Sequence, residues 1–343
     1  MPLYATVRGD RMKSDLVTEA ERIADEVLFP AALATDRAET VPVELLDALA
    51  DAGLYGLTGP ASAGGLEADF GDVCAVVERL ASGCLTTAFV WVQHLGAVFA
   101  AAGSSNAAVA AWLPELCRGE RRAGLALGGA LPGKPLLVAL EAGDDWSLSG
   151  VSPFVSGWGR IDVIHTSART EDGRLIWALV DAEERETLSV ERLELVALDA
   201  TATVRASFLD HIVPATRVTS VGAYEEGPLP PALVRIHAAL ALGVVRRCCA
   251  LLGPTPLDGQ LEGLRDELDE LDPDTIGASR AGAGDLALRA AAALALQTGS
   301  RSLLLTEHAQ RLAREALFCL VYALRPDARE AALRSLAGGA GSS

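Results

Sequence analysis

The chain has 343 residues and a formal net charge of −17, and 50% of its residues are hydrophobic while only 5% are aromatic. This acidic balance leaves no basic footprint for nucleic acid and no attraction to anionic membranes, so neither kind of partner is expected. The length exceeds what one hydrophobic core usually fills, which predicts two or three subdomains. The apolar residues are mainly alanine, leucine and valine, a composition typical of packed helices.

The first third of the sequence predicts helices. Their periodicity and turn residues place them at residues 13–29, 42–52, 69–82, 86–102 and 104–118. The first helix is expected to stop at Pro30, and the second to run from Pro42 to Gly53. The fourth helix is apolar on most faces, which indicates that it is buried.

Beyond residue 119 the pattern changes to short β-rich runs between turn residues. The clearest strands are predicted at 146–149, 163–168, 175–180 and 202–212. Their regular spacing favours a β-barrel or sandwich. Helical patterns then return at 228–252, 257–271, 281–297 and 306–324.

This order predicts an α+β fold in three parts. The expected boundaries give an N-terminal α-helical domain at 1–119, a central β-barrel or sandwich domain at 120–224, a C-terminal helical bundle at 225–337 and a disordered tail at 338–343.

The cysteines and the N-terminal sequence favour a soluble, cytoplasmic protein without a metal site. Six cysteines include no Cys-x-x-Cys pair, so free buried thiols are expected; they stand at positions 74, 84, 117, 248, 249 and 319. The start of the chain shows no basic-then-apolar signal peptide. The apolar run at 86–102 carries Gln93 and His94 and is slightly short for a membrane span.

Residues 150–158, Gly-Val-Ser-Pro-Phe-Val-Ser-Gly-Trp, form the most informative segment of the chain. They predict a strand that turns on Gly157, and residues 162–169 predict a strand that runs back beside it. Phe154, Val155 and Ser156 would then stand at a strand end, where they can cover a flat ring and offer it one hydroxyl. The alternative is that Ser156 is an ordinary turn serine that caps Gly157.

This segment resembles the flavin-flanking segment of the acyl-CoA dehydrogenase family, whose pattern is Gly-x-Lys-x-Trp-Ile-Ser/Thr-Gly. Residues 51–66 are similar to the family's Ala-Gly-Leu-x-Gly-Leu … Gly-Gly turn, and residues 200–215 to its strand that ends in Val-Pro-Ala. The resemblance extends from about Lys13 to Arg329. It implies an FAD-binding protein with an all-α domain, a β domain and a four-helix bundle.

The resemblance also implies cofactor-binding residues at three places along the chain. They are Leu127, Gly128, Gly129, Phe154, Val155, Ser156, Gln297, Gly299 and Arg301. Around Leu127, Gly128 and Gly129 the hydroxyl and carboxylate side chains of the family are missing, so backbone N–H groups are expected to contact the edge of the flavin ring. At the second place Phe154 stands where the family usually has tryptophan, and Ser156 would donate to the ring. The third group, Gln297, Gly299 and Arg301, would contact the diphosphate of the cofactor across a subunit interface, with Arg301 as a phosphate ligand.

The glutamate that the family uses as its catalytic base is not found at either of its usual positions. Acyl-CoA dehydrogenation needs a carboxylate to remove the α-proton while hydride leaves the β-carbon for the flavin. Ala323 and Val234 occupy the two positions at which family members carry that glutamate. The sequence therefore indicates a divergent member whose catalytic residue is unknown. His94 and Arg235 are expected in the substrate pocket, although a lone histidine on an apolar helix is more often a satisfied core residue.

Several functional hypotheses remain open. The chain is a dehydrogenase with a relocated base (His94, His237 or Glu315), or one subunit of a mixed oligomer whose partner supplies the base. A third hypothesis is a flavin-dependent monooxygenase of the same fold, with His308 as its late histidine, and a fourth is a flavin-free scaffold. We expect Glu315 to form an ion pair with Arg311 on its own helix.

The expected function is α,β-dehydrogenation of an acyl thioester by an FAD-linked oxidoreductase of fatty acid metabolism. Its partners would be an acyl-CoA or acyl-carrier-protein thioester and an electron-transfer partner. A homo- or hetero-oligomer with a related subunit is expected, because the long apolar bundle helices would otherwise expose too much surface.

Overall fold

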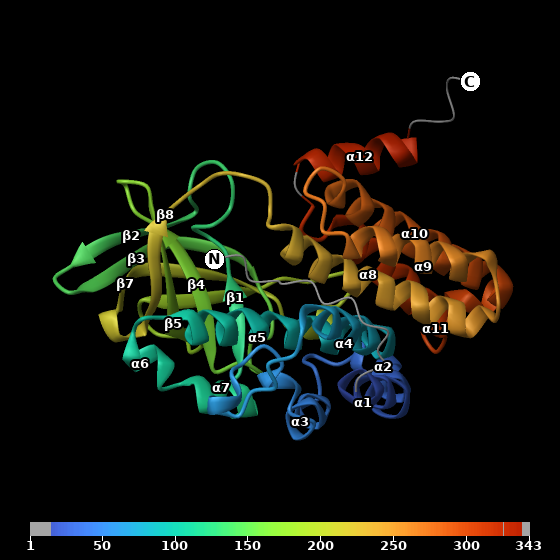
Figure 1. The fold of residues 1–343 in the computed structure, drawn as a ribbon, viewed down its shortest axis with the longest axis horizontal. Coiled ribbons are helices and arrows are strands. Elements are labelled where there is room, and N and C mark those ends of the chain that lie inside the picture. The colour runs from blue at the N-terminus through green and yellow to red at the C-terminus, as the bar shows by residue number, and fades with distance from the viewer. Residues whose placement is uncertain (1–14, 325, 338–343) are drawn as a thin grey trace.

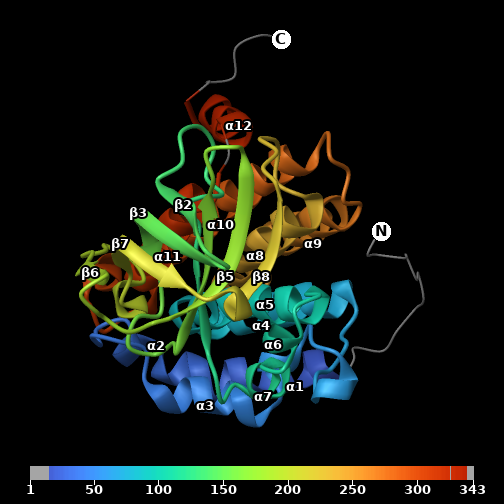
Figure 2. The ribbon, with the colours of Figure 1, turned by 90° about the vertical axis from the view of Figure 1, so that its left-hand side faces the viewer.

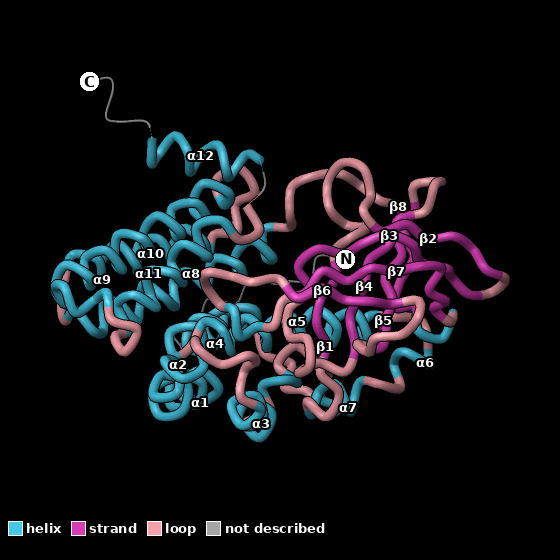
Figure 3. Tube along the Cα trace, turned by 180° about the vertical axis from the view of Figure 1, so that it is seen from behind, coloured by secondary structure: helices cyan, strands magenta, loops and turns pink. Residues whose placement is uncertain are grey.

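The computed structural model describes residues 15–324 and 326–337, so the tail expected at 338–343 lies outside the described residues. The described chain consists of N-terminal helices, one β-sheet and a C-terminal helical bundle (Figure 1). The N-terminal helices lie beneath both the sheet and the bundle in Figures 1 and 2. Figure 3 shows the strands gathered at one end of the molecule and the long helices of the bundle at the other.

The N-terminal helices follow the predicted order, with two differences. They are α1 (Asp15–Ile23), a π turn (Ala24–Leu28), α2 (Phe29–Thr35), α3 (Val43–Asp51), α4 (Phe70–Gly83), α5 (Leu85–Gly103), α6 (Ala107–Ala110) and α7 (Leu113–Arg118). The helix expected to stop at Pro30 continues to Thr35, because the π turn shifts the hydrogen-bond ladder before the proline: the Phe29 N–H donates to Ala24 O. The helix expected at 104–118 is divided into α6 and α7.

Helix α5 is the central element that connects the three parts. By length and composition it could cross a membrane, but 67% of the relevant window is buried inside the structure, which is usual for the core helix of a soluble protein. One face of α5 packs against α4 and α8, and its C-terminal half packs on the sheet through Ala97 and Val98, which share a core cluster with Val163 and Leu179. The expectation that this helix is buried is confirmed.

The strands form one mixed sheet in the order β6-β7-β3-β2-β4-β5-β8, with β1 parallel to β4. Their bounds are β1 (Ala123–Ala126), β2 (Leu137–Ala142), β3 (Asp145–Val155), β4 (Val163–Arg169), β5 (Arg174–Asp181), β6 (Leu188–Arg192), β7 (Val204–Val213) and β8 (Val218–Ala223). The four predicted strands are present. The sequence did not predict β1, β2, β6 and β8, and the supposed flavin loop at 125–133 begins inside β1.

The C-terminal bundle contains five helices among the described residues. They are α8 (Pro231–Leu252), α9 (Pro256–Asp269), α10 (Ile276–Thr298), α11 (His308–Val321) and α12 (Pro326–Ala337). Helix α8 crosses α4 closely at Gly243, where an added Cβ would lie 2.6 Å from both Ala81 Cβ and Glu78 O. This crossing joins the bundle to the N-terminal helices. All six cysteines are free and buried, as expected.

Candidate functional site

Phe154 lies on a β-bulge and presents an exposed aromatic ring. In the pairing of β3 with β7, Ser152 faces Ala206 and Val155 faces Val204, so one extra residue is inserted on β3. Phe154 takes a positive φ of 57° and is 66% exposed, whereas Val155 is buried. A bulky residue with φ > 0 is an outlier that costs about 1–3 kcal/mol and is typical of functional sites. The bulge therefore aims an aromatic ring outward at a strained position.

Ser156 belongs to a buried chain of hydroxyl groups. Its Oγ lies 2.8 Å from Thr203 Oγ1, which lies 2.7 Å from Thr201 Oγ1, and Thr201 donates to Leu198 O at 2.7 Å. Because the Thr201 proton is used on Leu198, Thr203 must donate to Thr201 and Ser156 to Thr203. The hydroxyl of Ser156 is thus left as an acceptor, which contradicts the expected donor role. Nor does Ser156 cap Gly157, whose N–H donates to Thr201 O.

The loop that follows β1 is closed against the sheet rather than open to a ligand. A Cβ on Gly128 would lie 2.6 Å from Val151 O, and one on Gly129 would lie 2.5 Å from Ala168 Cα. The Gly129 N–H already donates to Ser167 O at 2.9 Å. These glycines allow close backbone packing, so the expectation that the Gly129 amide meets a flavin is wrong. Leu127 is the exposed member of the three.

Arg169, which the sequence analysis did not single out, holds this loop in place. Its buried guanidinium donates to Gly129 O and Leu131 O, both at 2.7 Å, and to Gly133 O at 2.9 Å. The guanidinium also lies 3.3 Å from the centroid of the Tyr224 ring. The position of Arg169 at the end of β4 was a usable signal, because an arginine that ends a fully buried strand must find acceptors nearby.

Gln297, Gly299 and Arg301 lie where α10 ends, at the end of the bundle far from the sheet (Figure 1). Arg301 is exposed and forms an ion pair with Glu307 at 2.6 Å. The structure therefore does not bring this group together with Phe154 and Ser156 within one chain. Exposed leucines surround the same turn; they are Leu296, Leu303, Leu304 and Leu305.

The two residues expected in the substrate pocket have other partners. His94 is buried and uses both ring nitrogens: Nδ1 accepts from the Ala123 N–H and Nε2 donates to Leu116 O, each at 3.0 Å. Arg235 is buried and donates to Asp269 at 2.7 Å. The expectation that His94 meets substrate is wrong because the fold saturates its hydrogen bonds, and Arg235 faces α9 instead.

Two other candidate catalytic residues, Glu315 and His308, make structural contacts instead. Glu315 is buried and accepts from Arg311 at 2.5 Å, as expected for an ion pair on α11. Burial raises the pKa of Glu315 and the Arg311 charge opposes that rise. His308, the candidate for a monooxygenase, stacks on Phe29 of α2 with ring centroids 4.2 Å apart. Neither residue lines a cavity described below.

A cavity of about 200 Å³ lies at the end of the bundle that faces the sheet, and we call it the Ala323 cavity. Its wall combines the start of α8, the start of α10 and the segment that follows α11. Val234 and Ala323 both line it, so the two positions at which the sequence resemblance led us to expect a glutamate meet at one cavity. Its described lining residues include Arg280 and His237 but no aspartate or glutamate. Ala323 has a positive φ of 55° and, with Phe154, is one of seven such non-glycine positions among the described residues.

An aromatic cluster joins this cavity to the sheet. Tyr322 packs against His237 with ring centroids 5.1 Å apart, and against Phe89 at 4.9 Å and Phe318 at 5.2 Å. Phe89 belongs to α5, and the next residue, Val90, lies against Gly157. Gly157 ends residues 154–157, which we call the Phe154 segment. Burial and the Arg280 charge lower the pKa of His237 to about 3, so it is neutral and a weak base at pH 7.

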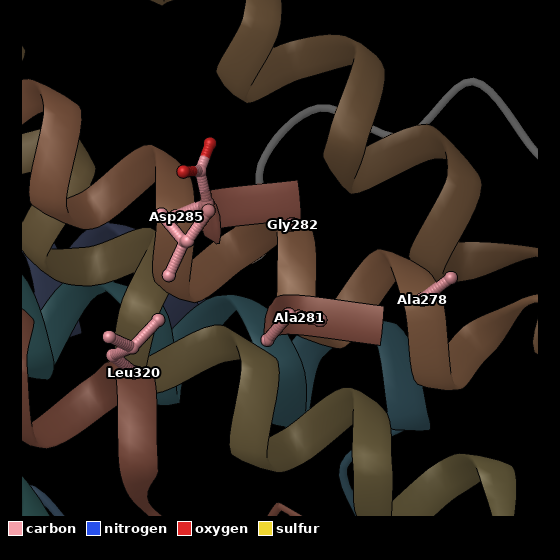
Figure 4. A pocket seen from close by; sticks show the side chains of 7 residues that line it. Ala278, Ala281, Gly282, Asp285 and Leu320 are labelled. Carbon is pink, nitrogen blue, oxygen red and sulfur yellow. The ribbon is translucent and has the colours of Figure 1, made fainter. Parts of the chain in front are cut away.

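A second cavity, of about 180 Å³, offers no reactive group. It lies between α10, α11 and α12 (Figure 4) and is lined mainly by small residues such as Ala278, Ala281 and Gly282. Its described acidic residue, Asp285, is paired with Arg289 at 2.8 Å. We therefore place the candidate site at the Ala323 cavity and the Phe154 segment.

Buried neutral histidines should make the stability of the protein fall as the pH falls. Burial lowers the pKa of His94, His165 and His308 to about 4, and that of His237 to about 3. The unfolded chain binds these protons near pH 6.5, so the stabilisation is present above that pH and is lost towards pH 4. A fully buried histidine contributes up to about 1.4 kcal/mol per pH unit in that window, and the half-buried His308 contributes less. Urea unfolding at pH 7 and pH 5 measures the loss.

His165→Phe is a suitable control for this pH dependence, because a phenyl ring can keep the contact with Trp177 but cannot take up a proton. The variant should show a shallower slope than the natural chain between pH 7 and pH 5. A free energy of unfolding that stays constant or rises as the pH falls would contradict the prediction.

Comparisons with known proteins agree with this fold. Residues 12–120 match a family model described as acyl-CoA dehydrogenase, N-terminal domain. A 3-sulfinopropanoyl-CoA desulfinase of Paraburkholderia xenovorans (strain LB400) is 27% identical over 227 residues, which cover 62% of this chain and 57% of the relative. A (2S)-methylsuccinyl-CoA dehydrogenase of Cereibacter sphaeroides is 30% identical over 156 residues, or 44% of this chain and 28% of the relative. The chain thus aligns with little more than half of the first relative and under a third of the second.

Solved structures confirm the expected arrangement of helical domain, β domain and helical bundle. The glutaryl-coenzyme A dehydrogenase complex with glutaryl-CoA has a TM-score of 0.82 at 16% identity, and the match covers 97% of each chain. The methanesulfinate monooxygenase of Pseudomonas fluorescens has a TM-score of 0.73 at 22% identity, covering 95% of this chain and 98% of the other. At these identities the likeness shows the fold, which hosts more than one reaction.

Proposed function

Because the chain belongs to the acyl-CoA dehydrogenase-like family, we propose that it is a flavin-dependent enzyme of acyl thioesters that lacks its own base for α,β-dehydrogenation. One observation carries the second half of this proposal: Val234 and Ala323 line the same cavity, and neither can accept a proton. The described lining contains no carboxylate that could replace them. A related subunit that contributes a carboxylate, in a hetero-oligomer, would complete the reaction.

The proposed flavin is FAD, with its ring beside Phe154. Support comes from the exposed aromatic ring of Phe154. Exposed apolar side chains also stand at Val196 and, on α11, at Leu317 and Val321, and Arg314 of α11 donates to Val196 O at 3.1 Å. A bound flavin supplies the acceptor for a substrate hydride. The chain itself supplies a flat apolar flank and the acceptor oxygen of Ser156.

The position of the third group of expected cofactor residues supports an oligomer. Gln297 and Arg301 lie at the far end of the bundle from Phe154, so in this proposal they contact the flavin of another subunit. The leucines around them include Leu296, 84% exposed, and Leu303, 82% exposed, which is more apolar surface than a monomer usually presents at one turn. We propose a soluble, cytoplasmic oligomer that passes electrons to a separate carrier protein.

The substrate is proposed to be an acyl-CoA. The two curated relatives are named for the thioesters 3-sulfinopropanoyl-CoA and (2S)-methylsuccinyl-CoA. Within this chain the largely apolar Ala323 cavity, whose lining residue His237 contacts Tyr322 of the aromatic cluster, would hold a short acyl group. The monooxygenase alternative is less well supported, because its candidate His308 stacks on Phe29 and does not line this cavity.

Absorbance spectroscopy tests the proposal directly. The purified protein should show a flavin band that anaerobic butyryl-CoA shifts without bleaching. Ser156→Trp should abolish flavin binding by filling the space beside Phe154, while Ser189→Trp, at an exposed position of β6, should keep the flavin. Circular dichroism must show that both variants are folded.

Each result bears on a different part of the proposal. Rapid bleaching of the natural protein by butyryl-CoA would show that the chain has its own base. A protein that binds no flavin under any condition would remove the cofactor assignment. Full flavin occupancy in Ser156→Trp would move the cofactor away from Phe154.

A further inference from the structure

Arg280 on α10 is a buried cation without a counter-charge. It is 2% exposed, and its Nη2 donates to Cys319 O and Tyr322 O, both at 2.9 Å. Its Nε and Nη1 are buried and have no hydrogen-bond partner. A guanidinium carries five N–H protons, so the two on Nη2 are used and three remain without an acceptor.

Three other buried arginines have a carboxylate partner, whereas buried Arg169 donates from all of its nitrogen atoms to backbone carbonyls. Arg235 has Asp269, Arg247 has Asp25 and Arg311 has Glu315 as a carboxylate partner. Arg280 has no such ion pair with any residue in the part of the chain that the structure describes. A buried charge without a partner costs several kcal/mol in general. Unlike Arg169, Arg280 has neither a carboxylate partner nor carbonyl acceptors for all of its nitrogen atoms.

A purely structural role accounts for only part of Arg280. Its two carbonyl partners lie at the C-terminal end of α11, where a cation is favourable and free carbonyls need donors. This role uses Nη2 alone. Arg280 is also one of the residues that line the Ala323 cavity.

The other residues that line the Ala323 cavity determine which charge a bound ligand can carry. The described lining residues are mostly proline, aliphatic and alanine side chains, and His237 is the other titratable group. From the end of α11, Arg280 meets the carbonyl oxygens of Cys319 and Tyr322. The cavity thus holds one cation and no described anion, which complements a small carboxylate ligand.

We propose that Arg280 binds a carboxylate-type oxyanion at the end of the acyl group, so that the preferred substrates are thioesters of dicarboxylic or similarly acidic acyl chains. The acid group would accept hydrogen bonds from Nη1 and Nε, and the apolar wall would hold the methylene groups. The anion site stands on the contacts of Arg280 alone, whereas the thioester part rests on the proposed function.

The anion site is tested first without a thioester. Thermal unfolding of the natural protein should shift upward with succinate and stay unchanged with succinamide, which has the same length but no charge. Arg280→Gln should lose the succinate response. Arg289→Gln, an exposed arginine on the same helix, should keep it. Val234→Phe retains Arg280 but fills the cavity, and should lose the response as well.

A natural protein that succinate does not stabilise, or an Arg280→Gln variant that it stabilises equally, would overturn the inference. If Arg280→Gln does not fold, Val234→Phe still decides, because it alters the cavity without removing the contacts to α11.

Paired thioesters then separate this inference from the proposed function. Calorimetric titration should give about tenfold tighter binding of succinyl-CoA than of butyryl-CoA, since a charge-assisted hydrogen bond distinguishes them. In Arg280→Gln the two affinities should become equal, because succinyl-CoA loses its advantage over butyryl-CoA. Equal binding of both thioesters by the natural protein overturns the acid preference alone. Failure to bind either one, with a normal succinate response, overturns the thioester function and leaves the anion site.

Discussion

Replacing Ala323 by glutamate is expected to let butyryl-CoA reduce a flavin that it otherwise leaves oxidised. The substitution restores a carboxylate at the wall of the cavity, at the position where most of the family carries its base. General-base catalysis contributes roughly 10²–10⁴-fold to such a step, so flavin bleaching should accelerate by at least about a hundredfold. Ala323 already has φ 55°, so glutamate faces the same backbone strain as the alanine it replaces.

Arg280 makes this prediction sharper. A glutamate at position 323 would share the cavity with its guanidinium, which favours the ionised carboxylate that a base requires. The same carboxylate would occupy the proposed anion site, so the variant should also lose its thermal stabilisation by succinate. Both effects come from one substitution but are read by different measurements, anaerobic stopped-flow absorbance and thermal unfolding.

Ala323→Gln is the matched control, because it has the same shape and cannot accept the proton. It should leave the flavin oxidised. Val234→Glu places the carboxylate at the second family position on the opposite wall and should give partial activity. A glutamate variant that binds butyryl-CoA and flavin yet shows no bleaching would contradict the assignment of this cavity as the acyl site.

The sequence predicted helices and strands well where turn and capping residues agreed with the hydrophobic periodicity. Helix α3 lies between Pro42 and Gly53 as expected, and Gly53 takes the left-handed φ of 72° that a glycine after a helix allows. Strands β4 and β5 were found because their β-branched runs end in turn residues. The prediction that the first helix stops at Pro30 was wrong, because a π turn that depends on packing cannot be read from local propensity.

The candidate site could be predicted only in part, because it depends on contacts between distant segments. Sequence comparison identified Val234 and Ala323 separately, but only the fold places both on one cavity. The orientation of the Ser156 hydroxyl depends on Thr201 and Thr203, which a pattern at 150–158 cannot contain. Arg280 stands in a helix rich in alanine and glycine, and that small-residue context was a signal that neighbours pack closely around it.

Replacing Glu315 by alanine is expected to lower the free energy of unfolding by about 3–5 kcal/mol. Glu315 and Arg311 are both buried on α11 and bonded at 2.5 Å, and Arg311 Nε and Glu315 Oε2 have no further partner. Removal of the carboxylate leaves the guanidinium of Arg311 without a counter-charge in the core. Urea unfolding at pH 7 measures the loss.

The structure offers a matched control and a rescue for this change. Glu330 pairs with Arg334 at the same spacing on α12, but both side chains are exposed, so Glu330→Ala should leave stability unchanged within error. The double variant Arg311→Met with Glu315→Leu removes both charges and should recover most of the loss, because apolar pairs can replace buried ion pairs. Flavin reduction distinguishes this structural role from catalysis. If Glu315 were the catalytic base, the natural chain would reduce its flavin with butyryl-CoA and the folded double variant would not. A double variant as unstable as Glu315→Ala would instead show that the cost comes from lost packing rather than from an unpaired charge.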